Sequence, residues 1–118
     1  EMAPSKEDLA RFVCPCCGRN RINPKVAALV AALESDVGEE LKVNSGYRCE
    51  DRNREVGGSP TSSHLVGEAV DLACAASRLR YRLLNAAIRR GVHRMGIGKS
   101  YIHLDVDPTK DPRVVWTY

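Results

Sequence analysis

The segment from residue 23 to residue 38 places the firmest constraint on how this chain can fold. Asn23 is a favourable N-cap, Pro24 suits the first helical position, and Gly38 is able to end the helix. Between these signals the apolar residues recur at helical spacing, as Val26, Leu29, Val30 and Leu33. A helix with one apolar stripe buries that stripe against another element, which predicts layers around one core. A length of 118 residues agrees with a single domain, which we place at residues 3–118.

Two further helices and one irregular region follow from similar signals. Residues 5–12 predict a short helix capped by Ser5, and residues 77–90 predict a long helix ended by Gly91. Residues 47–61 are polar and predict an ordered loop or a short helix plus loop. The last dozen residues predict a proline-interrupted tail that carries Trp116.

Strands are predicted where apolar residues alternate or run together. These segments are 41–46, 68–74, 93–98 and 100–106, with a tight turn near Gly98 between the last two. Helices and strands do not alternate regularly along the chain. The sequence therefore predicts an α+β fold with a small, mostly antiparallel sheet and helices packed on one side.

One of these strands carries a carboxylate in an otherwise apolar run. Asp71 lies between Val70 and Leu72, and on a two-residue period it shares a face with Ala69 and Ala73. An ionised, partly buried carboxylate needs a partner, and a metal ion is one such partner. An ion pair with one of the chain's arginines is the alternative.

The other candidate ligands are histidines. His103 and Asp105 are two residues apart in "YIHLDV", so their side chains point the same way from a strand. With His64 and Asp71 of "SSHLVGEAVD", the chain offers the three protein ligands that are typical of catalytic zinc sites. The alternative for His103 is a satisfied core histidine. The third histidine, His93, follows a helix-ending glycine and is expected at the surface.

Five separated stretches resemble, in order and spacing, the zinc D-Ala-D-Ala carboxypeptidase family, the M15 peptidases. They are "SGYR" at 45–48, Asn53, "VGG" at 56–58, "SSHLVGEAVD" at 62–71 and "YIHLDV" at 101–106. The resemblance covers about residues 22–107 and is closest to short, single-domain peptidases of bacterial and phage origin. It implies the fold shared with the hedgehog signalling domain. It also implies one zinc ion held by His64, Asp71 and His103.

The resemblance implies roles for further residues. Arg48 matches an arginine that grips a substrate carboxylate, as a guanidinium can with two parallel hydrogen bonds. Ser62 matches a serine near the substrate. Many family members carry an acidic residue or a histidine three residues before the last ligand as general base, but that position here is Ser100. Asp105 is therefore the candidate base, and orienting His103 is its alternative role.

The implied activity is zinc-dependent hydrolysis of peptidoglycan stem peptides, by a D-Ala-D-Ala carboxypeptidase or a related endopeptidase. A hedgehog-like zinc domain that binds without catalysis is the alternative, which the missing acid at position 100 favours. A small basic binding module without metal is a further alternative.

Charge and hydropathy limit the other partners. The net charge of +3 is a mild bias, so no nucleic-acid partner is predicted. No apolar run reaches the ~18 residues of a membrane span. No signal peptide is visible, and we expect a monomer.

The five cysteines are Cys14, Cys16, Cys17, Cys49 and Cys74, and they leave three interpretations open. All can be reduced thiols, or a disulfide can tie the "CPCC" loop to Cys49. Alternatively Cys14, Cys17 and Cys49, with or without Cys74, can form a structural metal site, because C-x-x-C is half of a zinc knuckle.

Overall fold

The computed structural model describes residues 5–118, so residues 3–4 of the predicted domain lie outside the described residues. It confirms the predicted α+β class, with a five-stranded sheet and a short 3-10 turn, η1, ahead of the second strand. The elements are, in order, α1 (Lys6–Ala10), α2 (Pro24–Val37), β1 (Val43–Ser45), α3 (Glu50–Glu55), η1 (Ser63–Val66), β2 (Ala69–Ala73), α4 (Ser77–Arg89), β3 (Arg94–Ile97), β4 (Tyr101–Asp105) and β5 (Val114–Thr117).

The expected helix boundaries of α2 match the structure closely. Asn23 caps the first turn by accepting a hydrogen bond from the backbone N–H of Lys25, and Gly38 ends the helix with a φ of 77°. α1 is shorter than the predicted 5–12, but Ser5 does cap it through a reciprocal pair of hydrogen bonds with Asp8. Local side-chain chemistry at the termini was therefore a sound guide to where these helices begin.

The sheet has the order β1-β2-β4-β3-β5 and is antiparallel except for the β3–β5 pair. The prediction that the chain ends in a tail is wrong for residues 114–117, which form β5 parallel to β3. The pairing joins Arg94 to Val114 and Gly96 to Trp116, across an intervening strand and turn. Sequence signals are weak for such a strand, because it is short and its partner is not its neighbour along the chain.

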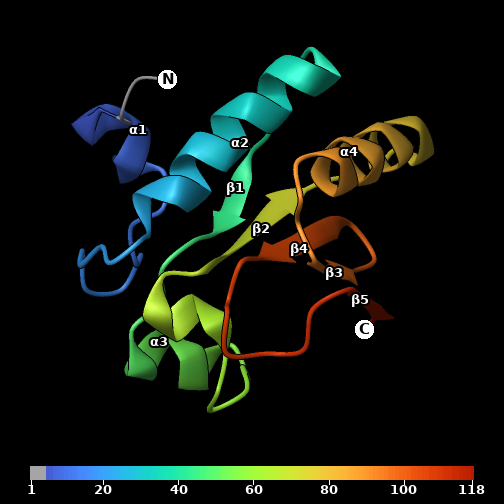
Figure 1. Cartoon of the computed structure of the whole chain (residues 1–118). Helices are drawn as coiled ribbons and strands as arrows, with labels where there is room; N and C mark the ends of the chain where they lie inside the picture. Colours follow the sequence, from blue (N-terminus) through green and yellow to red (C-terminus); the bar gives the residue numbers. More distant parts are fainter. Residues whose placement is uncertain (1–4) are drawn as a thin grey trace.

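Helices α2 and α4 cover one face of the sheet (Figure 1). The core between these layers holds alternate residues of β2 and β4 together with the apolar stripes of both helices. Its fully buried members include Val70, Leu72, Ile102, Leu104, Val30, Leu33 and Leu83. The residues between them in β2 and β4, among them Asp71 and His103, therefore face the other side of the sheet. No helix within residues 5–118 is long and apolar enough to cross a membrane.

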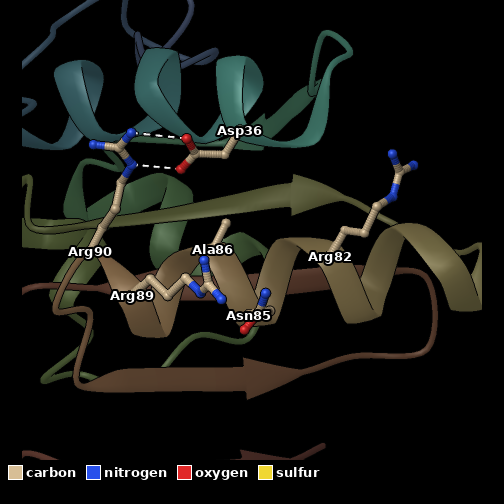
Figure 2. Close-up of a pocket in the computed structure, with 6 residues that line it drawn as sticks. All are labelled: Asp36, Arg82, Asn85, Ala86, Arg89 and Arg90. Carbon is tan, nitrogen blue, oxygen red and sulfur yellow. Dashed lines mark hydrogen bonds and ion pairs between the residues drawn. The ribbon is translucent and has the colours of Figure 1, made fainter.

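The outer surface of the helix layer carries a hollow between α2 and α4 (Figure 2). Asp36 and Arg90 close it with two hydrogen bonds of 2.6 and 2.9 Å, and Arg82 and Arg89 line it. It contains one carboxylate and no histidine or cysteine, so it offers no group of metal ligands. The Asp36–Arg90 contact joins the C-terminal ends of the two helices.

Gly67 makes the turn from η1 into β2, and two constraints require a glycine there. Its φ is 72°, in the left-handed region, where a side chain is strained. A Cβ atom at this position would also lie 1.8 Å from the backbone oxygen of Arg21. The Gly67 carbonyl accepts a hydrogen bond from the backbone N–H of Asn23 at 2.9 Å, so this contact joins the start of α2 to the start of β2.

We predict that Gly67→Ala destabilises the fold much more than Gly38→Ala. Gly38 has a similar φ of 77°, but an added Cβ there would meet no atom within 4 Å, so Ala costs only about 1 kcal/mol of left-handed strain. Gly67→Ala adds a clash with backbone and is expected to cost about 3 kcal/mol or more. Chemical denaturation of the two metal-free variants measures the difference. Equal losses in the two variants would contradict the packing argument.

Candidate active site

The three ligands predicted from sequence converge on the sheet face opposite α2 and α4. Each of His64, Asp71 and His103 offers one ligand atom, and these three atoms lie within 4.8 Å of one another. Asp71 and His103 are directly opposite each other in the β2–β4 register, and His64 reaches them from η1. Asp71 Oδ1 lies 2.9 Å from His103 Nδ1 and 3.3 Å from His64 Nε2.

His64 is fixed by its second ring nitrogen. Nδ1 lies 2.7 Å from the carbonyl oxygen of Gly46, and a carbonyl can only accept, so Nδ1 carries the proton and donates it. Nε2, the nitrogen that could bind a metal, is thereby left facing Asp71. The ring is 1% exposed, so packing also holds it in place.

His103 is held in the same manner by a carboxylate. Its Nε2 donates to Asp105 Oδ2 at 2.8 Å, which turns Nδ1 towards Asp71. Asp105 Oδ1 in turn accepts a hydrogen bond of 2.7 Å from Arg94 Nε. The Arg94 guanidinium lies 5.0 Å from the ring centre of Trp116, in a cation–π contact. A chain of contacts from β5 through β3 to β4 therefore sets the orientation of one predicted ligand.

Ionic contacts between these groups determine their proton affinities. Burial by itself would raise the pKa of Asp71, but hydrogen bonds from His103 and His64 outweigh it and hold the pKa well below its ordinary value. Burial alone would lower the pKa of His103, but the carboxylates of Asp105 and Asp71 outweigh it and raise the pKa. Asp71 is therefore an ionised carboxylate, and it retains 19% side-chain exposure towards solvent.

This donor set fits a zinc ion. Two imidazole nitrogens and one carboxylate oxygen are ordinary zinc ligands, and each histidine has its other nitrogen bound to a fixed acceptor, as ligating histidines usually do. The alternative partner for Asp71, an arginine, is not seen, because its described ion pairs are with the two histidines. The surface position expected for His93 is confirmed, since its side chain is exposed.

Arg48 and Ser62 lie beside this cluster. Nη2 of Arg48 donates to Ser62 Oγ at 3.3 Å, while its Nε is buried without a hydrogen-bond partner. Burial lowers the pKa of Arg48, and the nearby Asp71 carboxylate opposes that shift. Among residues 5–118 the ion pairs within 4.0 Å do not include Arg48. A half-buried guanidinium with unused donors is suited to an incoming carboxylate.

The structure separates the two roles considered for Asp105. Ser100, at the position of the missing acid, is exposed on the turn between β3 and β4. Asp105 is 2% exposed, and both of its oxygens are hydrogen-bonded, to His103 and to Arg94. It contacts the nitrogen of His103 that points away from Asp71. This placement supports the orienting role over the role of general base.

Sequence reasoning missed an aromatic group next to His103. The Trp116 ring centre lies 5.5 Å from that of His103, and Tyr118 lies 5.4 Å from Tyr101 and 6.4 Å from Trp116. Burial raises the pKa of both Tyr101 and Tyr118, and the negative charge of Asp71 adds to the shift. The run "VVWTY" at 114–118, with its β-branched and aromatic residues, was the signal that could have located this strand.

Comparison with known proteins assigns the chain to a family. The family model described as Peptidase M15 matches residues 8–107, which includes every residue of the ligand cluster and Arg48. None of the curated proteins matches the chain at a significant level. The match covers most of the sequence, and it agrees with a structure in which the resembling motifs meet at one site. The chain belongs to the M15 peptidase family.

Proposed function

We propose that the protein is a zinc-dependent peptidase that hydrolyses peptide bonds in peptidoglycan stem peptides, as a D-Ala-D-Ala carboxypeptidase or a related endopeptidase. Family membership supports peptidase activity on peptide substrates, and the finer assignment is ours. The observation that carries it is the convergence of His64, Asp71 and His103, with the second nitrogen of each histidine already engaged.

Three protein ligands would leave a fourth coordination position of a bound zinc ion for water or substrate. A zinc ion held there would supply Lewis acidity, which polarises a peptide carbonyl and lowers the pKa of water. The contribution of the chain is to keep the ligands in one geometry, through Gly46 for His64 and through Asp105 for His103. Asp71 is the partly exposed member, so solvent and substrate approach from its side.

Arg48 supplies the binding determinant for the substrate. Its unpaired donors lie close enough to Asp71 for the two charges to interact, and it is held by Ser62. A substrate carboxylate bound by Arg48 would place a nearby peptide bond at the ligand cluster, which fits cleavage near a free C-terminus. The Tyr101, Trp116 and Tyr118 side chains would line the cleft beside His103.

A hedgehog-like zinc domain without catalytic activity remains the second candidate. The observation that favours it is the serine at position 100, where many family members carry a general base. The commitment of Asp105 to His103 and Arg94 adds to this argument, because it leaves no obvious substitute base. Digestion of peptidoglycan followed by mass analysis of the products distinguishes the two, since only a peptidase releases shortened peptides.

We predict that His64→Ala removes one equivalent of zinc and abolishes peptidase activity. Loss of one of three ligands, together with its fixed hydrogen bond to Gly46, leaves two donors that are too few for tight binding. Metal analysis and a peptide-release assay provide the measurement, with circular dichroism to verify the fold. His93→Ala, at an exposed histidine outside the cluster, is the matched control and keeps both properties. An active His64→Ala protein with unchanged zinc would refute the ligand assignment.

We predict that Arg48→Ala lowers kcat/KM on substrates with a free carboxylate by roughly 30-fold or more, which corresponds to about 2–5 kcal/mol of transition-state binding. Arg48→Lys keeps the charge but not the planar fork, so it restores only part of the rate. Amidating the substrate carboxylate reproduces the loss in the unmodified protein. The control is Arg52→Ala, one turn along in α3. Wild-type kinetics in Arg48→Ala would exclude this residue from substrate binding.

We predict that Asp105→Asn weakens zinc binding by about 10–100-fold, as expected when a partner that orients a ligand is altered. Excess zinc then restores much of the rate, because the variant is nearly isosteric and keeps the fold. Zinc titration against a competing chelator, together with rate measurements at several zinc concentrations, tests this. A variant with unchanged zinc affinity and a rate lower by about 10²–10⁴-fold would instead identify Asp105 as the general base.

A further inference from the structure

A second group of metal-ligating side chains lies outside the candidate active site. The sulfur atoms of Cys14, Cys16, Cys17 and Cys49 all lie within 4.8 Å of one another. Separate Sγ–Sγ distances are 3.7 Å for Cys14–Cys16, 3.6 Å for Cys14–Cys49 and 3.2 Å for Cys16–Cys49. Four thiolates in a tetrahedron around zinc, each at about 2.3 Å, lie about 3.8 Å apart. The cluster therefore needs little movement to enclose an ion.

The backbone of residues 14–19 directs the first three sulfurs to one place. The N–H of Cys14 donates to the carbonyl of Arg19 at 2.8 Å, and the N–H of Gly18 donates to the carbonyl of Cys14 at 3.0 Å. Gly18 has a φ of 72°, which allows this tight reversal. Cys14 and Cys17 thus have the C-x-x-C-G arrangement of a zinc knuckle, with Cys16 as an additional ligand on the same turn.

Main-chain contacts that involve no cysteine side chain bring Cys49 to this turn. The N–H of Tyr47 donates to the carbonyl of Phe12 at 2.8 Å, and Phe12 is almost fully buried. A Cβ on Gly46 would lie 2.6 Å from the Cα of Phe12, so the two segments pass in direct contact. Contacts of the fold that do not involve the sulfur atoms therefore place Cys49 beside the other three cysteines.

Backbone N–H groups also point at two of the sulfur atoms. The N–H of Cys49 donates to Cys14 Sγ at 3.5 Å, and the N–H of Arg52 donates to Cys49 Sγ at 3.4 Å. Burial alone would raise the pKa of Cys14, but hydrogen bonds, the largest of them from the N–H of Cys49, outweigh it and lower the pKa, which favours the thiolate that binds metals. Cys74 takes no part, because it is buried in the hydrophobic core. The sulfur cluster therefore includes Cys16 and does not include Cys74, which was one candidate for a fourth ligand.

We propose that Cys14, Cys16, Cys17 and Cys49 bind a second zinc ion, which has a structural role. All four ligands are protein thiolates, and a closed four-coordinate site of this kind stabilises a fold. The ion would tie the loop after α1 to the residue that follows Arg48, so it would brace the segment from which Arg48 extends. This inference is independent of the proposed peptidase function, because it concerns different ligands.

The other two interpretations of the cysteines explain less of the geometry. A disulfide from the "CPCC" loop to Cys49 uses two of the sulfurs and gives no reason for the other two to converge on them. If the cysteines were only reduced, inert thiols, there would be no reason for four of their sulfur atoms to lie together. Cys16 and Cys17 are both exposed, so neither is placed in the cluster by burial of its side chain.

The decisive protein is His64→Ala, purified without chelator, because it removes the other candidate site. We expect it to retain about one zinc per chain, with X-ray absorption showing only sulfur neighbours at about 2.3 Å. Cobalt substitution should give the thiolate-to-cobalt charge-transfer absorption. Adding Cys16→Ser and Cys17→Ser, at exposed positions, should abolish both signals and lower the thermal midpoint. Cys74→Ala in the same background is the matched control and should leave both signals unchanged.

Two results would overturn the proposal. One is a His64→Ala protein that holds no metal and whose cluster thiols react equally fast with and without chelator. The other is a disulfide among the four cysteines, found by mass spectrometry of protein handled without reductant. Failure of the His64, Asp71 and His103 site gives a separate result, because wild type and His64→Ala would then hold the same single zinc bound by sulfur alone.

Discussion

The antiparallel register between β2 and β4 is the constraint on which the rest of the site depends. It places Asp71 opposite His103 on one face and Val70 opposite Leu104 on the other. A slip of one residue in either strand would move the polar group of that strand into the core and turn its apolar residues to the opposite face. Burial of the apolar face beneath α2 and α4 therefore also positions the ligands. The hydrophobic core and the candidate active site therefore lie on opposite faces of the same pair of strands.

Hydrogen bonds fix the orientation of the two histidine rings in the ligand cluster. His64 is anchored to the Gly46 carbonyl and His103 to Asp105, so the rings cannot rotate freely when the ligand atoms face one another. The anchor for His103 extends through Arg94 to Trp116, on a strand that pairs in parallel at the sheet edge. The two histidines are therefore held by different acceptors: His64 by a backbone carbonyl and His103 by a carboxylate. The consequence is that three candidate donor atoms are held close together, with both histidine rings fixed in orientation.

The segment around residues 46–49 connects the proposed functions of the molecule. Gly46 supports His64, Arg48 lies near Asp71, and Cys49 belongs to the sulfur cluster. Its backbone is held from two directions, by Phe12 through Tyr47 and by the carbonyl of His64 through the N–H of Arg48. A structural ion at Cys49 would stiffen the same segment from its outer side. Precise placement of a substrate-binding guanidinium requires such support, because small displacements at a reacting centre have large effects on rate.

The sequence by itself determined the two long helices, the α+β class and the three residues to predict as metal ligands. Local signals were enough to place α2, because Asn23, Pro24 and Gly38 each act on the helix turn next to them. Alternation in β2 and β4 was enough to put Asp71 and His103 on the polar face. Only the tertiary structure decided the β5 pairing, the commitment of Asp105 to His103 and Arg94, and the grouping of Cys16, rather than Cys74, with the other three cysteines. Those outcomes depend on contacts between residues distant in the chain, whose geometry is set by packing of the whole domain rather than by local preference.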